Sequence, residues 1–296
     1  MTIAQLIQQE RLPADFTDTV DRYYRPLADR VAQGSADGPT LLGINGGQGT
    51  GKSTMALFLS HLLAEEHGLK VAVLSIDDLY LTRAARIELG ESVHPLLVTR
   101  GVPGTHDPVL GLEVIETLMT ASDDTRTPLP RFNKAVDDRV PENEWPVFEG
   151  KADVVILEGW CVGATPQSDE ELTEPINALE RDDDAQGQWR GYVNEQLSGP
   201  YRPLFERIDF MILLKAPSMA CIREWRGEQE AKLRAKMEES GGDMSQLMDD
   251  VAIDRFIAHY QRLTEHQWRV MVPTADAVLD LATDHRITNL SWKEEA

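Results

Sequence analysis

Eight residues from Gly46 to Ser53 carry the clearest chemistry in the chain. They read Gly-Gly-Gln-Gly-Thr-Gly-Lys-Ser and match the phosphate-binding pattern G-x-x-x-x-G-K-[ST]. In this pattern, backbone N–H groups surround a triphosphate, the lysine reaches its β- and γ-phosphates, and the serine hydroxyl binds Mg²⁺. We expect the glycines at 46, 47, 49 and 51 to adopt positive φ and so to turn the N–H groups inward. The predicted nucleotide contacts are Gly46, Gly47, Gln48, Gly49, Thr50, Gly51, Lys52, Ser53 and Thr54.

Carboxylates follow two predicted strands near this loop. Residues 70–75 predict a strand that ends before Asp77 and Asp78, and residues 153–157 predict another that ends at Glu158. Asp77 is the candidate general base for an attacking hydroxyl; it could instead cap the next turn, and Asp78 could exchange roles with it. Glu158 is a candidate Mg²⁺ ligand, directly or through water, with a solvated strand end as the alternative.

Cationic side chains cluster in segments where anionic groups would bind. Arg223 and Arg226 are three residues apart on a predicted helix, so they share a face, as a closing lid would need. Each cation alone could be a surface ion pair, and a histidine in a loop could serve only as a hydrogen-bond partner. Together they predict a site for phosphate and a carboxylate. The other candidates are Arg100, His106, Arg131 and Lys134.

The segments around these residues alternate between short apolar runs and amphipathic stretches. Strands are predicted at 40–44, 70–75, 153–157, 208–215 and 277–281. Helices are predicted after the phosphate loop until Gly68, from Asp107-Pro108, and from a Pro217-Ser218 cap to about residue 239; a loop is predicted from 90 to 107. This alternation is typical of an α/β fold with a doubly wound parallel sheet, whose strands bind ligands at their carboxyl ends.

The domain organisation follows from the same reading. Residues 1–39 form an N-terminal helical segment, with the helix over residues 12–33, and residues 40–296 form the main domain. Residues 164–205 are an acidic helical insertion, which we expect to be solvated.

The composition limits the partners. With 296 residues and a formal charge of -21, the surface repels nucleic-acid backbones and anionic membranes, so we expect neither as a partner. No signal-peptide pattern and no apolar run long enough to cross a bilayer is found, which predicts a cytoplasmic protein. Cys161 and Cys221 lack the spacing of a zinc site or disulfide framework. The oligomeric state stays open.

Other classes of phosphate-loop protein fit less well. A GTPase needs D-x-x-G and then N-K-x-D, but the segment Asn133–Asp137 has its aspartate one position late, and Asp184–Gly187 follows rather than precedes it. A motor-type ATPase would have aspartate where Leu157 stands. Both departures favour a kinase for a small metabolite.

Several motifs together resemble the plant-type D-glycerate 3-kinases, within the wider pantothenate kinase, uridine kinase and phosphoribulokinase set. The resemblance covers about residues 40 to 281 and rests on GINGGQGTGKST, SIDDLYLT, HPLL with RGVPGTHD, PRFNKA and LEGWCVG. It implies a kinase-type P-loop NTPase fold with a helical lid and a small acidic substrate. It also implies Asp77 as the base, Glu158 at the metal, and Arg226 as the lid arginine. The substrate contacts that we predict are Asp78, Tyr80, Arg100, His106, Arg131 and Lys134.

The sequence thus predicts an ATP- and Mg²⁺-dependent phosphotransferase, with Lys52, Asp77 and Arg226 as catalytic residues and D-glycerate, converted to 3-phosphoglycerate, as the first acceptor to consider. The alternatives are a kinase for pantothenate, a nucleoside or another small alcohol, and a regulatory or assembly ATPase without a small acceptor.

Overall fold

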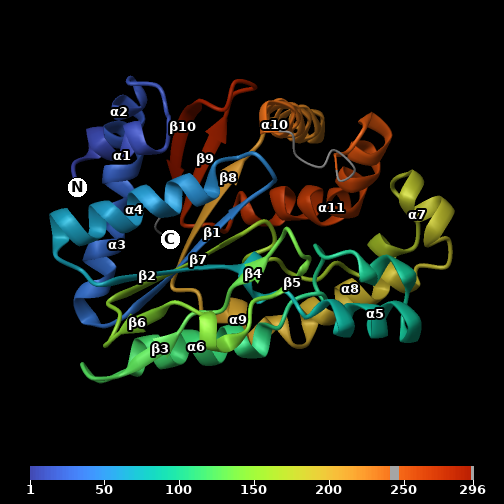
Figure 1. The fold of residues 1–296 in the computed structure, drawn as a ribbon, viewed down its shortest axis with the longest axis horizontal. Helices are drawn as coiled ribbons and strands as arrows, with labels where there is room; N and C mark the ends of the chain where they lie inside the picture. The colour runs from blue at the N-terminus through green and yellow to red at the C-terminus, as the bar shows by residue number, and fades with distance from the viewer. Residues whose placement is uncertain (241–246, 295–296) are drawn as a thin grey trace.

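A six-stranded sheet forms the centre of the molecule (Figure 1). The computed structural model describes residues 1–240 and 247–294. The strand order is β10-β9-β8-β1-β7-β2, and every neighbouring pair is parallel except β9 and β10. The doubly wound parallel sheet is therefore confirmed, with one antiparallel edge strand that the sequence analysis did not anticipate. The strands are β1 (Thr40–Gly46), β2 (Val71–Ser75), β7 (Val154–Gly159), β8 (Phe210–Lys215), β9 (Ala277–Leu281) and β10 (Ile287–Trp292).

Alternating side chains of the strands pack on opposite faces of the sheet. In β1, Leu42 and Ile44 enter one core, and Leu41 enters the other. The first core lies under α1 (Ile3–Gln9), α3 (Arg25–Gly34) and α4 (Lys52–His67). The second lies under α6 (Pro108–Thr120), α8 (Gln188–Ser198) and α9 (Tyr201–Glu206). Because helices cover both faces, the central strands β1, β7 and β8 are largely apolar, whereas the edge strand β10 is mostly exposed. The ligand site is left to the ends of the sheet.

The N-terminal segment packs into the first core. After α1 come α2 (Phe16–Thr19), a π-helical turn (Val20–Tyr24) and α3. The rings of Phe16 and Tyr24 contact Phe58 of α4 at centroid distances of 5.3 and 6.1 Å. Residues 1–39 thus share a core with the rest of the chain, and their separate status as a domain stays a prediction.

Several short elements were not predicted because they are too short to have a clear period. They are α5 (Arg83–Ser92), the antiparallel pair β3 (Arg126–Pro128) with β6 (Val147–Glu149), and the hairpin β4 (Phe132–Asn133) with β5 (Asp138–Arg139). The predicted loop from 90 to 107 also contains the end of α5 and a 3₁₀ turn at Pro95–Val98. Further 3₁₀ turns are Ser35–Asp37, Ile76–Leu79, Glu142–Glu144 and Glu170–Leu172.

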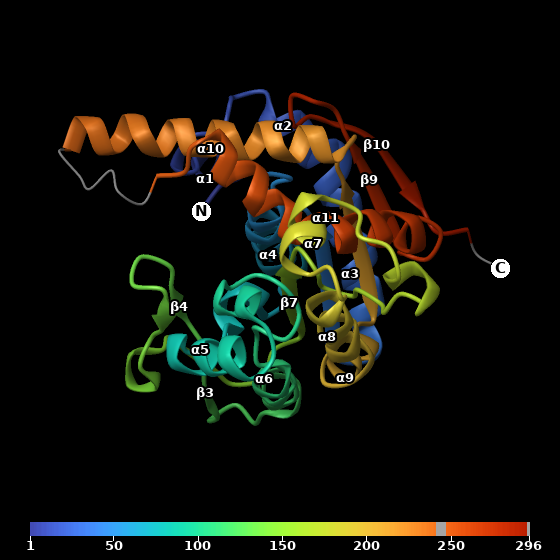
Figure 2. The same ribbon diagram turned by 90° about the vertical axis from the view of Figure 1, so that its right-hand side faces the viewer.

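Two long helices follow β8. They are α10 (Met219–Ser240) and α11 (Asp250–Met271), and they pack against each other. Figure 2 shows α10 extending beyond the body of the molecule above α5 and β4. Among the described residues, no helix is long and apolar enough to cross a membrane.

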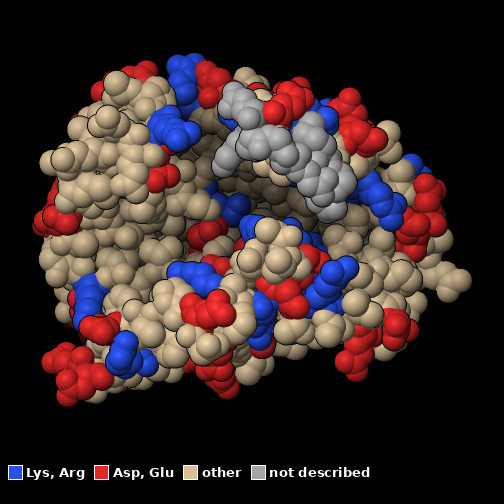
Figure 3. All heavy atoms as spheres, viewed as in Figure 1, with Lys and Arg blue, Asp and Glu red and all other residues tan. Residues whose placement is uncertain are grey.

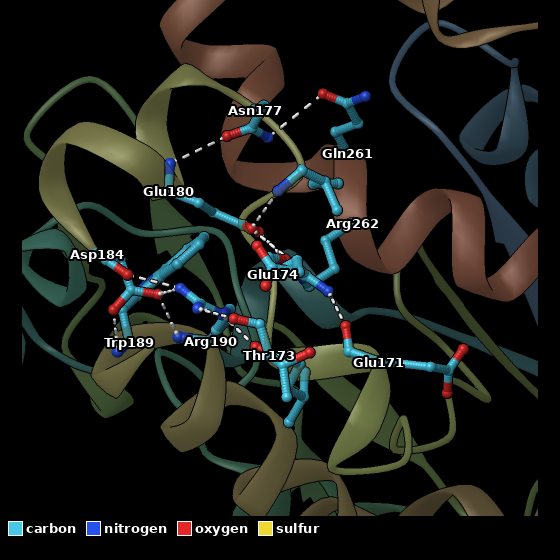
Figure 4. Close-up of polar contacts among 12 residues, drawn as sticks. Glu171, Thr173, Glu174, Asn177, Glu180, Asp184, Trp189, Arg190, Gln261 and Arg262 are labelled. Carbon is cyan, nitrogen blue, oxygen red and sulfur yellow. Dashed lines mark hydrogen bonds and ion pairs between the residues drawn. The ribbon is translucent and has the colours of Figure 1, made fainter. Parts of the chain in front are cut away.

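The acidic segment 164–205 is not simply solvated, and that expectation was wrong for its central acids. Glu180 of α7 (Ala178–Asp183) is fully buried, and Asp184 is 2% exposed. The guanidinium of Arg262 in α11 lies 2.6 Å from Glu180 Oε2, and the guanidinium of Arg190 lies 2.9 Å from Asp184 Oδ2 (Figure 4). The pair of Glu180 and Arg262 fixes the segment to α11, and the pair of Asp184 and Arg190 lies within the segment, so its acidity serves internal pairing as well as the surface.

Candidate active site

The phosphate loop joins the end of β1 to the start of α4. Gly49 and Gly51 have positive φ, of 82° and 86°, as predicted. The same expectation was wrong for Gly46 and Gly47, which are glycines for lack of space. A Cβ atom at Gly46 would lie 2.5 Å from Thr50 Oγ1, and one at Gly47 would lie 2.6 Å from Ile222 Cδ1. The loop conformation thus depends on positive φ at Gly49 and Gly51 and on close packing at Gly46 and Gly47.

Helix α10 and the β9–β10 hairpin form the support of this loop. A Cβ atom at Gly49 would lie 2.7 Å from Cβ of Trp225, which is 1% exposed. The Trp225 indole donates a hydrogen bond to the carbonyl of Thr283, and its ring stacks on His285 at 4.4 Å. Nδ1 of His285 lies 3.0 Å from the Gly49 carbonyl. Residues more than 170 positions downstream therefore hold the loop in place, and local sequence reasoning had no signal for them.

Ser53 and Glu158 meet at the start of α4, where Lys52 is the first residue. The Ser53 hydroxyl donates to Glu158 Oε1 at 2.9 Å. Glu158 is 6% exposed, so it is not the solvated strand end that was the alternative, and its Oε2 has no hydrogen-bond partner among the described residues. A buried carboxylate oxygen without a partner, next to a serine hydroxyl, suits a hard cation such as Mg²⁺. Lys52 has no ion-pair partner in the described part of the chain, so its ammonium group can bind a ligand.

Asp77 lies in the 3₁₀ turn after β2, facing the phosphate loop. Ser75, not Asp77, caps this turn, because the Ser75 hydroxyl accepts the N–H of Asp77. Oδ2 of Asp77 lies 2.6 Å from Lys134 Nζ, and Oδ1 accepts the Tyr80 hydroxyl at 3.0 Å. Burial acts to raise the pKa of Asp77, but the positive charges of Lys134 and Lys52 together outweigh it and hold the pKa below its ordinary value. Asp77 is therefore ionised at neutral pH.

Asp78 points toward a different set of partners. Its carboxylate accepts the backbone N–H of Phe132 at 3.1 Å and pairs with Arg131 at 3.2 Å. Burial raises the pKa of Asp78, partly offset by the Phe132 N–H and Arg131. Asp78 thus fastens the β4–β5 hairpin over the turn that carries Asp77, and both Arg131 and Lys134 are brought to this position.

Arg100 is held beside the same hairpin. Arg100 and the almost fully buried Arg86 both pair with Asp137, which has a φ of 57° in the hairpin turn. Both guanidinium groups also lie 5.7 Å from the centroid of the Phe132 ring. Because two arginines share one carboxylate, this cluster keeps a net positive charge toward the site. Asp137, the misplaced aspartate of the GTPase-like segment, has this structural role.

His106 is buried and packs against the ring of Tyr80. The hydroxyl of Tyr201 accepts the N–H groups of Gly104 and His106, so its own proton is donated to His106 Nδ1 at 2.8 Å. The imidazole stacks on the Tyr80 ring at 4.3 Å. Burial lowers the pKa of His106 to about 4, so the ring is neutral. The loop hydrogen bond is therefore present, and a direct substrate contact by His106 stays a prediction.

Arg223 and Arg226 do share the face of α10 that lies toward α11. Arg226 pairs with Glu230 at 2.7 Å, and its guanidinium lies 5.3 Å from the ring centroid of Phe256. Arg223 pairs with Asp254 at 2.6 Å and with Asp250. Arg226 is only 17% exposed, whereas the acids that hold Arg223 are open to solvent.

A hollow opens on one face of the molecule between these elements (Figure 3). Lys and Arg side chains lie within it and along its lower wall, although the molecule as a whole is strongly acidic. The sequence analysis missed three aromatic residues beside this site, which come from helices far along the chain: Trp225, Phe256 and Tyr260. Their positions at helical spacing are equally typical of ordinary core residues.

Comparisons with known proteins agree with this geometry. No protein-family model matches the chain. The chloroplastic D-glycerate 3-kinase of Arabidopsis thaliana is 28% identical over 229 residues, which are 75% of this chain and 46% of that protein. The solved D-glycerate 3-kinase of Cryptococcus neoformans superposes with a TM-score of 0.73 at 25% identity, covering 90% of this chain and 99% of that one. A Schizosaccharomyces pombe protein, the uncharacterized kinase mug58, is 32% identical over 229 residues, covering 75% of this chain and 78% of that kinase.

The chain belongs to the family of P-loop kinases that includes these relatives. The kinase is an ATP-dependent phosphotransferase, and its acceptor is a small metabolite. Enzymes of this class use ATP together with Mg²⁺. The fold class predicted from the sequence, including its kinase type, is thus confirmed, and the regulatory ATPase without an acceptor is set aside.

Proposed function

We propose that this kinase transfers the γ-phosphoryl group of ATP to the 3-hydroxyl of D-glycerate. The observation that carries the proposal is the position of Asp77, an ionised carboxylate beside Lys52 and under a hairpin that presents Arg131 and Lys134. A base close to the phosphate lysine suits an attacking hydroxyl, and nearby cations suit an acceptor that carries a negative charge. The D-glycerate 3-kinases among the relatives support the choice of acceptor.

In this proposal each residue of the site has one role. The P-loop N–H groups and Lys52 hold the phosphates of ATP, and Asp77 orients the acceptor hydroxyl and accepts its proton. Lys52 and Arg226 stabilise the negative charge that develops on the phosphoryl oxygens. The Tyr80 hydroxyl orients the carboxylate of Asp77 by its hydrogen bond to Oδ1. Tyr80 is therefore better described as a positioning residue than as a substrate contact.

Ser53 and Glu158 would hold Mg²⁺. The partnerless Oε2 of Glu158 and the Ser53 hydroxyl are oxygen donors of the kind this ion prefers. When bound, the ion neutralises charge on the β- and γ-phosphates. Arg100 and Arg131 would bind the carboxylate of the acceptor, since guanidinium groups pair with carboxylates in a bidentate manner.

The remaining candidates are kinases for other acceptors. Pantothenate is also a carboxylate, so the cationic cluster does not separate it from D-glycerate, whereas a nucleoside has no charge to match Arg100 and Arg131. The division at residue 39 and the cytoplasmic location are further proposals. The location is supported only by composition, and one relative is chloroplastic.

The direct test measures ADP release from Mg·ATP by the purified protein with and without D-glycerate. The proposal expects strong stimulation by D-glycerate and formation of 3-phosphoglycerate, identified by NMR. Stimulation by pantothenate or a nucleoside, with none by D-glycerate, would contradict it and would name the acceptor instead.

A further inference from the structure

Tyr260 of α11 lies among residues of the proposed acceptor site without belonging to any predicted motif. It is 5% exposed, and its ring packs edge-on against Trp160 at 4.7 Å and, tilted by 49°, against Phe256 at 4.9 Å. Phe256 is the ring beneath the Arg226 guanidinium, and Trp160 donates a hydrogen bond to the carbonyl of Gly101. Tyr260 therefore lies between the lid arginine, Arg226, and the loop that carries Arg100.

The hydroxyl of Tyr260 is accommodated but not paired. A Cβ atom at Gly101 would lie 2.5 Å from this hydroxyl, so only glycine leaves room for it. No described residue hydrogen-bonds to it, and its oxygen is not among the enclosed unpaired atoms of the described residues, so a small molecule can reach it. A phenylalanine would keep the same ring contacts with Trp160 and Phe256, so the packing of this ring does not require the hydroxyl. The hydroxyl thus occupies space that the fold provides while its hydrogen-bonding capacity is left for a ligand.

The charges around Tyr260 define which kind of ligand group it would bind. Burial first, and then the negative charge of Asp77, raise the pKa of Tyr260 well above its ordinary value, partly offset by Arg100 and Arg226. The phenol is therefore protonated and can donate its hydrogen. Its cationic neighbour Arg100 favours an anionic acceptor atom.

We propose that Tyr260 is a specificity-determining residue that donates a hydrogen bond to the carboxylate of the acceptor acid, beside Arg100. This inference rests on the proposed function, because it requires a small hydroxy acid as the substrate. It also gives α11 a direct contact with the acceptor, in addition to the contact that α10 makes with the phosphate loop.

The test compares Tyr260→Phe with wild type in steady-state kinetics, using D-glycerate and glycerol, which has the same kind of hydroxyl groups but no carboxylate. We expect the KM for D-glycerate to rise about tenfold or more, as for loss of a hydrogen bond to a charged group. The KM for ATP and the kcat/KM for glycerol should stay within about twofold, so the preference for the acid falls. A hydroxyl that only supports the fold would instead lower Tm and affect both acceptors.

Tyr24→Phe is the matched control. Tyr24 is 4% exposed in the first core, and no described residue hydrogen-bonds to its hydroxyl. Its substitution should change neither acceptor constant.

The possible outcomes separate the two proposals. If wild type phosphorylates D-glycerate and Tyr260→Phe leaves its KM unchanged or raises the KM for ATP instead, the role of Tyr260 is wrong and the proposed function stands. If wild type ignores D-glycerate but uses another hydroxy acid, the acceptor is wrong, and the same comparison with that acid and its uncharged analogue decides on Tyr260. If wild type prefers uncharged alcohols or uses no acceptor, both proposals fail.

Discussion

The ammonium group of Lys134 lies 2.6 Å from Oδ2 of Asp77, so the β4–β5 hairpin places a positive charge directly on the proposed base. Lys134 itself is 58% exposed, whereas Asp77 lies deeper in the site. An exposed lysine can leave without a large cost, because such ion pairs contribute little to stability. The pair therefore sets the protonation state of Asp77 more than it stabilises the fold.

Removing the charge of Lys134 should shift the pH dependence of the enzyme. Burial raises the pKa of Asp77 and Lys134 lowers it, so Lys134→Met should move the pKa of Asp77 upward. The base is active only when ionised. The acidic limb of kcat/KM against pH should therefore move to higher pH, and activity at low pH should fall first. Lys151→Met, a change at an exposed lysine at the opposite end of β7, should leave the profile unchanged.

Substituting the two neighbouring aspartates separates their roles. Asp77→Asn should lower kcat about 10²- to 10⁴-fold, the range for loss of a general base, with the Tm retained. Asp78→Asn keeps an oxygen for the Phe132 N–H, so it should lower kcat far less. Stopped-flow or coupled-assay turnover and thermal unfolding measure both. A larger loss from Asp78→Asn would assign the base to Asp78.

Arg226→Ala should lower kcat on the order of 10³-fold while ATP binding, measured by calorimetry, is largely kept. Arg226 is the more buried of the two arginines on this face of α10, next to Glu230 and Phe256. Arg223→Ala is the control, because that side chain pairs with exposed acids of α11. Equal losses of kcat in both variants would mean that the helix pairing, not the Arg226 charge, is what matters.

Arg100→Ala should raise the KM for an acidic acceptor about 10- to 100-fold more than the KM for ATP. The hairpin should tolerate this change because Arg86 still pairs with Asp137. Circular dichroism would verify the fold. A parallel rise in both KM values would argue against carboxylate binding by Arg100.

The buried pair of Arg262 and Glu180 should matter for stability. Arg262→Ala leaves a fully buried carboxylate without its partner, and we expect a loss of about 3–5 kcal/mol in the free energy of unfolding by urea. Arg255→Ala removes a pair between half-exposed side chains, Arg255 and Asp183, and should cost about 0–1 kcal/mol. Similar losses in the two variants would mean that the burial of the Arg262–Glu180 pair (Figure 4) does not increase its contribution to stability.

Most of the fold could be predicted from sequence, because its strands and longer helices have clear periods. The phosphate loop, Asp77 and Glu158 could be placed at one edge of the sheet because parallel strands share their carboxyl ends. The burial of Glu180 could not be predicted, since its partner Arg262 is 82 residues away. The same holds for Tyr260, whose role depends on the space left by Gly101 and not on any local pattern.

The contact between His285 and the Gly49 carbonyl also has a consequence for biosynthesis. The two residues are 236 positions apart, so the phosphate loop leaves the ribosome long before the ring that supports it has been made. The hydrogen bond from the Trp225 indole to the carbonyl of Thr283 also forms only after the β9–β10 turn has been made. A nascent chain that ends before the β9–β10 turn therefore lacks these supports of the phosphate loop, and the nucleotide site is complete only after this turn has been made.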